Sequence, residues 1–151
     1  MYKLLLSVIL FIGIWNYSFA DKLNGVWVQD IERQNKFNYA KANLSEDEIE
    51  VLSCSRQKMF FDLGVLITSQ EELMCEFKGE EVVIPPLEFK NYYRVLASSD
   101  DKVAVEIADA AGKGIVDILY FINDDTYWSY YYGDDTSADT HLRVYYRRVK
   151  E

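Results

Sequence analysis

Apolar and polar residues alternate with a period of two along most of the chain beyond residue 20. The clearest case is the segment 102–109, KVAVEIAD, in which Val103, Val105 and Ile107 fall on one face. Further strand-like runs occupy residues 26–30, 58–69, 72–78, 81–84, 88–97, 115–122, 126–132 and 141–149. Short turn sequences separate these runs. Many short strands at regular spacing predict an antiparallel β-sandwich or β-barrel.

One short helix is predicted between the first strand and the rest. In the sequence SEDE, the Ser45 hydroxyl can accept a hydrogen bond from the Glu48 amide while the Glu48 carboxylate reaches back, which is a capping box. Leu44 and Ile49 occupy the positions of a hydrophobic staple. The pattern therefore predicts a helix over residues 46–53 that covers one end of the strand structure.

The N-terminal residues 1–20 have the build of a secretory signal peptide. Lys3 precedes the apolar run 4–15, and Ser18 and Ala20 supply the small residues of a cleavage site. The apolar run is short for a bilayer span of roughly 20 residues. We therefore expect cleavage, a periplasmic or secreted product, and no membrane span afterwards.

The remaining residues, 21–151, are enough for one domain and too few for two. Loss of Lys3 with the leader changes the formal net charge from −9 to −10. A surface this acidic repels nucleic acid and anionic membranes. It would suit a basic protein partner.

Two cysteines, Cys54 and Cys75, follow the leader. In an oxidising compartment, such a pair most simply forms one disulfide, which contributes ~3 kcal/mol to stability. A catalytic thiol or a metal-binding pair is the alternative. It is disfavoured because no CxxC spacing occurs and the only histidine, His141, is distant in sequence. We find no nucleophile arrangement and predict no enzyme activity, no metal site and no cofactor.

Gly25 and Trp27, within the first-strand sequence LNGVWV, match the Gly-x-Trp signature of the calycin superfamily. The order of elements also resembles these lipocalin-like and fatty-acid-binding-like proteins. The resemblance implies an all-β, antiparallel up-and-down barrel of about eight or nine strands with one short helix. It also implies that Trp27 packs across the closed end, where Arg147 or Arg148 stacks on its indole.

Arg143 and Tyr145 resemble the Arg-x-Tyr pair in the last strand of fatty-acid-binding proteins. The resemblance implies that both side chains enter the cavity and bind a carboxylate, which needs a charged partner when buried. The alternative is that Arg143 is a solvated charge on an edge strand. An ordinary packed barrel would instead turn Leu142, Val144 and Tyr146 inward.

The segment 124–135, DDTYWSYYYGDD, contains five aromatic residues in six positions. Period two places Trp128, Tyr130 and Tyr132 on one face, and Tyr127, Ser129 and Tyr131 on the other. The larger apolar area predicts that the Trp128 face is inward and mostly core. Trp128, Tyr130 and Tyr132 are therefore candidate ligand contacts, the two tyrosines most of all.

Two functional classes remain. The first is an exported, non-enzymatic binding protein that holds a small apolar or amphipathic molecule in its barrel. The second is an acidic envelope protein that binds and inhibits a basic partner protein, as an enzyme inhibitor or immunity-type protein does. The high negative charge would speed association with such a partner.

Overall fold

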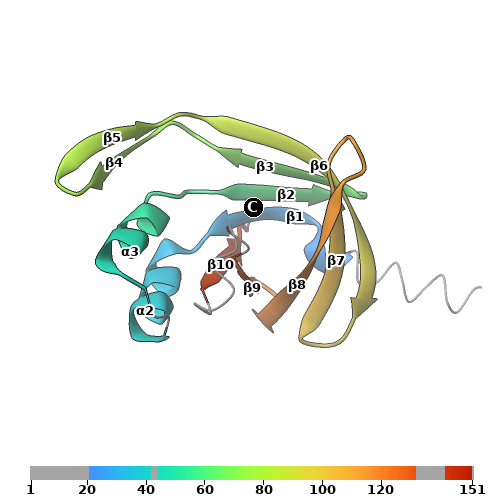
Figure 1. The fold of residues 1–151 in the computed structure, drawn as a ribbon. Coiled ribbons are helices and arrows are strands. Elements are labelled where there is room, and N and C mark those ends of the chain that lie inside the picture. The colour runs from blue at the N-terminus through green and yellow to red at the C-terminus, as the bar shows by residue number, and fades with distance from the viewer. Residues whose placement is uncertain (1–20, 42–43, 132–141, 151) are drawn as a thin grey trace, which may run out of the picture.

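The computed structural model describes residues 21–41, 44–131 and 142–150. Within them, eight antiparallel strands close into a barrel in the order β1-β10-β9-β8-β7-β6-β3-β2 (Figure 1). These strands are β1 (Gly25–Gln29), β2 (Lys58–Asp62), β3 (Val65–Gln70), β6 (Leu87–Ser98), β7 (Lys102–Ala108), β8 (Gly114–Asn123), β9 (Thr126–Tyr130) and β10 (Arg143–Arg148). Barrel neighbours follow chain order except where β4 and β5 intervene. The predicted all-β, up-and-down barrel is therefore confirmed.

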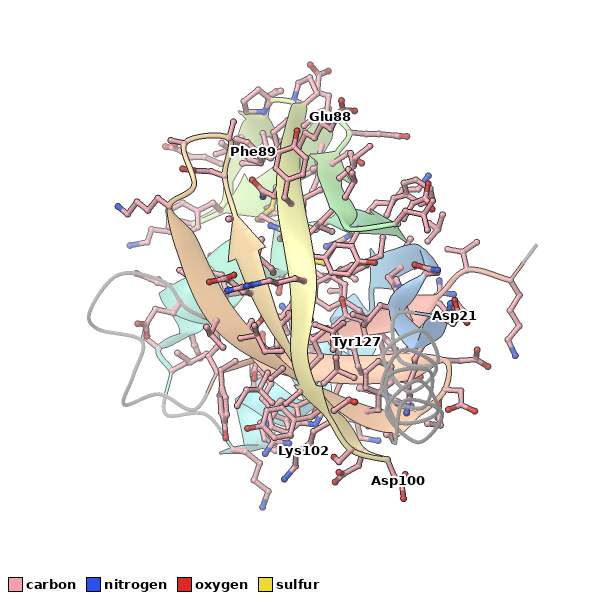
Figure 2. The ribbon with its side chains drawn as sticks, turned by 90° about the vertical axis from the view of Figure 1, so that its right-hand side faces the viewer. Asp21, Glu88, Phe89, Asp100, Lys102 and Tyr127 are labelled. Carbon is pink, nitrogen blue, oxygen red and sulfur yellow. A yellow bond between two sulfur atoms is a disulfide. The ribbon has the colours of Figure 1, made fainter. Side chains whose placement is uncertain are left out.

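One end of the barrel is closed by aromatic packing around Trp27. Its side chain is fully buried, its Nε1 donates a 2.8 Å hydrogen bond to the Leu23 carbonyl, and its ring meets the edges of Phe121 and Tyr127 at 6.0 and 4.8 Å. The Arg148 guanidinium lies 4.2 Å from the centre of the Trp27 ring. The predicted stacking is thus confirmed for Arg148. Figure 2 shows Tyr127 in the middle of the molecule.

Arg148, and not Arg147, is the stacking residue because strand alternation turns only one of them inward. Arg147 is exposed on the outer face of the sheet, where its partner in the strand register is Thr126 of β9. The Arg148 guanidinium also donates to the carbonyls of Asn24 and Lys22, the latter at 2.5 Å. It therefore joins the last strand to the segment that leads into β1.

The predicted helix is confirmed as α3 (Glu46–Ser53). The Ser45 amide donates to the Glu48 carboxylate at 2.8 Å, and the Glu48 amide donates to the Ser45 hydroxyl at 3.3 Å. Both halves of the capping box are therefore present. These hydrogen bonds lower the pKa of the exposed Glu48 carboxyl.

A second helix, α2 (Ile31–Lys41), was not expected. The Asp30 carboxylate caps it by accepting a 3.1 Å hydrogen bond from the Arg33 amide. Its inner face buries the polar Asn38, whose side-chain amide accepts from the Arg143 amide at 3.2 Å and donates to the Arg143 carbonyl at 3.0 Å. Packing through amides in place of an apolar stripe explains why the hydrophobic pattern did not predict this helix.

The strands β4 (Leu73–Phe77) and β5 (Glu80–Ile84) form a separate two-stranded hairpin, here called the arm. Its turn uses Lys78 and Gly79, both at positive φ, as a two-residue hairpin turn requires. Figure 1 shows the arm extending past the barrel on the same side as α2 and α3. The predicted disulfide Cys54–Cys75 is confirmed and joins the arm to the end of α3, with Cα atoms 5.6 Å apart.

A second contact fixes the tip of the arm. The Lys78 ammonium lies 2.5 Å from the Asp47 carboxylate, and the Lys78 amide donates to the Glu50 carboxylate at 3.1 Å.

None of the helices in the described ranges has the length and hydropathy needed to cross a membrane. The predicted signal peptide, residues 1–20, lies outside those ranges.

Replacing Cys54 and Cys75 together by Ala is expected to lower the free energy of unfolding by about 3 kcal/mol, because the unfolded chain regains loop-closure entropy. Urea unfolding followed by circular dichroism measures this loss. Wild-type protein treated with a reductant is the control and should unfold at the midpoint of the double variant. Equal midpoints for the oxidised wild type and the double variant would contradict the prediction.

Candidate functional site

A cavity of about 670 Å³ lies at the end of the barrel where the arm and α3 meet. Barrel strands, the α3–β2 segment and the arm all contribute to its wall. The lining residues are Gln29, Leu52, Cys54, Ser55, Gln57, Met59, Leu66, Thr68, Gln70, Cys75, Phe77, Val82, Ile84, Leu87, Asn91, Ile107, Ile115, Asp117, Ser129, Tyr130, Tyr131, Val144 and Tyr146. The disulfide is itself part of the wall, so it holds the arm against the cavity.

The cavity exists because inward side chains become smaller along the barrel axis. At the closed end, Trp27 and Phe61 fill the interior with large rings. Toward the arm, the inward positions on three other strands carry Thr68, Asn91 and Ser129. Short side chains at these positions cannot meet across the barrel, so space remains between the strands.

Two glutamine side chains fix the polar rim of the cavity. The Gln29 side-chain oxygen accepts from the Ser55 hydroxyl at 2.9 Å and from the Gln57 amide at 3.0 Å. The Gln70 side-chain oxygen accepts from the Arg56 amide at 2.9 Å. These bonds connect β1 and β3 to the segment that leads from α3 into β2. The rim is therefore held by side chains and does not rely on loop packing alone.

Asp117 is the only described residue of the lining whose side chain is charged at neutral pH. It lies on β8, and its Oδ1 accepts a 2.7 Å hydrogen bond from the Ile118 amide. Burial raises the pKa of its carboxyl to about 6 from an ordinary value of 3.8, although hydrogen bonds from the Ile118 amide and the Ser129 hydroxyl act to lower it. Burial also raises the pKa of the Tyr146 phenol, and the nearby Asp117 raises it further.

The expectation that Arg143 and Tyr145 face the cavity is wrong. Val144 and Tyr146 line the cavity, so alternation along β10 turns Arg143 and Tyr145 to the outer face. Outside, the Arg143 guanidinium lies 4.1 Å from the centre of the Phe37 ring and 3.7 Å from that of Trp128. Arg143 is therefore neither a carboxylate clamp nor a freely solvated charge.

The expectation that the Trp128 face is inward is also wrong. Tyr127 is 1% exposed and packs on the core, whereas Trp128 stacks on Tyr120 outside, with ring centres 4.1 Å apart. Stacking on Tyr120 and on Arg143 covers the indole from both sides, so it needs no place in the core. Tyr130 borders the cavity although its ring lies on the outer face with Trp128, at 5.2 Å between ring centres, and its role in ligand binding stays a prediction. Tyr132 lies outside the described residues.

Sequence reasoning missed the residue that distinguishes this cavity. Asp117 interrupts the strand-like run 115–122, and it shares a face with Leu119 and Phe121, which are buried. A single acid on the apolar face of a strand was the signal that could have found it. The contribution of the arm to the cavity wall was not predictable from a local pattern, because it depends on the direction in which the hairpin extends from the barrel.

Comparison with protein-family models, with curated proteins and with solved structures found no match to this chain. The barrel is compatible with the calycin architecture in strand number and direction. Within the described ranges, no group of three or more His, Cys, Asp or Glu side chains is placed to hold a metal ion.

The Asp117→Asn variant is expected to gain stability relative to the wild type as the pH rises. The folded state holds the Asp117 proton more tightly than the unfolded chain does. The proton on Asp117 therefore stabilises the wild-type fold below about pH 4, and this stabilisation is lost as the pH rises through about 6. The gain at about pH 8, relative to about pH 3.5, should be about 2 kcal/mol, after a discount for partial exposure.

Urea unfolding at the two pH values measures this difference. Asp100→Asn is the matched control, because it removes the same charge from an exposed turn at the periphery of the barrel (Figure 2). Its stability relative to the wild type should change by less than about 0.5 kcal/mol between the two pH values. The same change in both variants would mean that the carboxyl of Asp117 is not buried.

Proposed function

We propose that this protein is an exported, non-enzymatic binding protein of the calycin-like type that holds a small apolar or amphipathic molecule in its barrel. The observation that carries the proposal is the cavity of about 670 Å³ with mainly apolar walls. Ligand sites in proteins are typically clefts of about 300–1,000 Å³ lined by apolar and aromatic groups with a few polar ones. The cavity fits that description in volume and in chemistry.

The two ends of the barrel support the same proposal. The Trp27–Arg148 end is filled and hydrogen-bonded, which leaves the arm end for ligand access. At that end, the disulfide holds Cys75 and the neighbouring Phe77 against the cavity. A pre-organised wall reduces the entropy lost when a ligand binds. The disulfide also fits a periplasmic or secreted location.

The chemistry of the wall narrows the ligand. No Lys or Arg is among the described lining residues, so a carboxylate would be buried without a charged partner, at a high cost. Neutral hydrogen-bonding groups are present instead, among them Asn91 and Gln57, whose side-chain oxygen accepts from the Tyr146 hydroxyl at 3.0 Å. We therefore propose an apolar body with a polar group that is not anionic.

Native mass spectrometry of protein purified from its own host is expected to show a bound small molecule at one per chain. Solvent extraction should release that molecule, and the measured mass should then equal that of the chain without a ligand. Protein unfolded and refolded without extract is the control and should carry nothing. A stoichiometric basic protein in place of a small molecule would contradict the proposal and favour the partner-binding class.

Ile115→Trp is expected to weaken binding of the neutral apolar dye N-phenyl-1-naphthylamine by about tenfold, because the new ring occupies part of the cavity. Dye fluorescence titration gives the dissociation constant. Val116→Trp is the matched control: Val116 is 54% exposed on the opposite face of β8, and Ile115 is 58% exposed. Equal weakening by both substitutions would mean that the dye binds elsewhere.

A further inference from the structure

We propose that the natural ligand of the cavity is an amphipathic cation, a protonated amine with an apolar body, whose charge pairs with the carboxylate of Asp117. The inference rests on the proposed binding function and goes beyond it by assigning the polar group of the ligand. It also assigns Asp117 as the residue that selects this group.

The first argument is that the described part of the chain supplies no counter-ion for this carboxylate. Six ion pairs occur among the described residues, and none of them includes Asp117. The acid on the adjacent strand β7, Glu106, is paired with Arg94 outside the barrel. A half-buried carboxylate without a charged partner has lost part of its hydration, and a ligand that carries a positive charge would compensate for that loss.

The second argument comes from the hydrogen bonds around Asp117. Its neighbours inside the barrel include two phenols, but the Tyr146 hydroxyl donates to the Gln57 side-chain oxygen at 3.0 Å, and the Tyr127 hydroxyl points to the Met59 sulfur at 3.4 Å. Neither proton is directed at the carboxylate. The donors that remain are the Ile118 amide and the Ser129 hydroxyl. A carboxylate has about four acceptor sites, so part of its capacity is left for a ligand donor.

The third argument is the aromatic surface near the acid. Phe77, Tyr131 and Tyr146 line the same cavity. Aromatic faces attract ammonium groups and do not attract carboxylates, with the largest effect where water is excluded. The net charge of −9 acts in the same direction at longer range, because it concentrates cations near the molecule and repels anions. The Lys78 ammonium already lies 5.4 Å from the centre of the Phe77 ring, so the rings of Tyr131 and Tyr146 and the net charge are the features that favour a positive ligand group.

The apolar body of the ligand follows from the rest of the wall. Met59, Leu66, Ile107 and Val144 line the cavity from the barrel, and Val82 and Ile84 line it from the arm. A small inorganic cation would leave this surface in contact with water. Binding of an alkyl or aryl group would bury this apolar surface, which the hydrophobic effect favours.

The test uses three probes with the same eight-carbon chain: n-octylamine, n-octanol and n-octanoate. Isothermal titration calorimetry at about pH 7.5 gives the affinity of each for the wild type, Asp117→Asn and Asp100→Asn. We expect the wild type and Asp100→Asn to bind octylammonium at least about tenfold more tightly than octanol, and octanoate most weakly. Asp117→Asn should lose the preference for octylammonium and keep the affinity for octanol.

The pH dependence supplies an independent readout. Among the described residues, the titratable groups that interact electrostatically with Asp117 are the phenols of Tyr127 on β9 and Tyr146 on β10. On β7, Lys102 lies over the Tyr120 ring and Glu106 pairs with Arg94, both on the outer face. Burial raises the pKa of both phenols, so only the carboxyl changes charge below about pH 8. Lowering the pH from about 7.5 to 5 should weaken octylammonium about tenfold in the wild type and leave Asp117→Asn unchanged.

The outcomes separate the two proposals. Octanol binding as tightly as octylammonium in the wild type, with no effect of Asp117→Asn, would overturn the cation inference and leave the binding function standing. Tighter binding of octanoate would overturn it in the same way. Failure of all three probes to bind, together with failure of the neutral dye, would overturn the binding function itself.

Discussion

The closure of the barrel depends on one pair of side chains. Trp27 on β1 and Arg148 on β10 are direct cross-strand partners, and the guanidinium covers the indole at the seam between the first and last strands. Without this seam, the sheet would have two open edges, which are prone to pairing with other chains. The interaction joins residues 121 positions apart in sequence, so its formation carries a large cost in loop-closure entropy.

The same arrangement determines at which end of the barrel the cavity lies. Because the Trp27 end is filled by large rings, the space left by short side chains accumulates at the opposite end. There, the chain has placed α3, the arm and the disulfide, which form a wall that the barrel strands alone could not supply. The two ends of the barrel therefore have different roles. The Trp27 end closes the barrel, and α3, the arm and the disulfide shape the cavity at the other end.

The sequence predicted the features that local patterns determine. Period two predicted the strands, the capping box at Ser45 predicted α3, and the cysteine pair predicted the disulfide. The orientation of β9 and β10 was not predictable from their own residues, because α2 packs on the outside of β10. The ring centres of Phe37 on α2 and Tyr145 are 5.9 Å apart, and Tyr145 is therefore buried although it points away from the cavity. A rule that places the largest apolar area inside fails when the outer face is also covered.

A row of aromatic rings and one guanidinium packs on the outside of the barrel and affects which side chains the interior can hold. Tyr120, Trp128, Arg143 and Phe37 stack side by side across β8, β9, β10 and α2, so these positions contribute packing energy without using barrel volume. The alternate positions on the same strands are then released from the need to fill the core. Asp117 and Ser129 occupy two of them. Packing on the outer face of these strands therefore supplies stability that offsets the cost of a half-buried acid at an inward position.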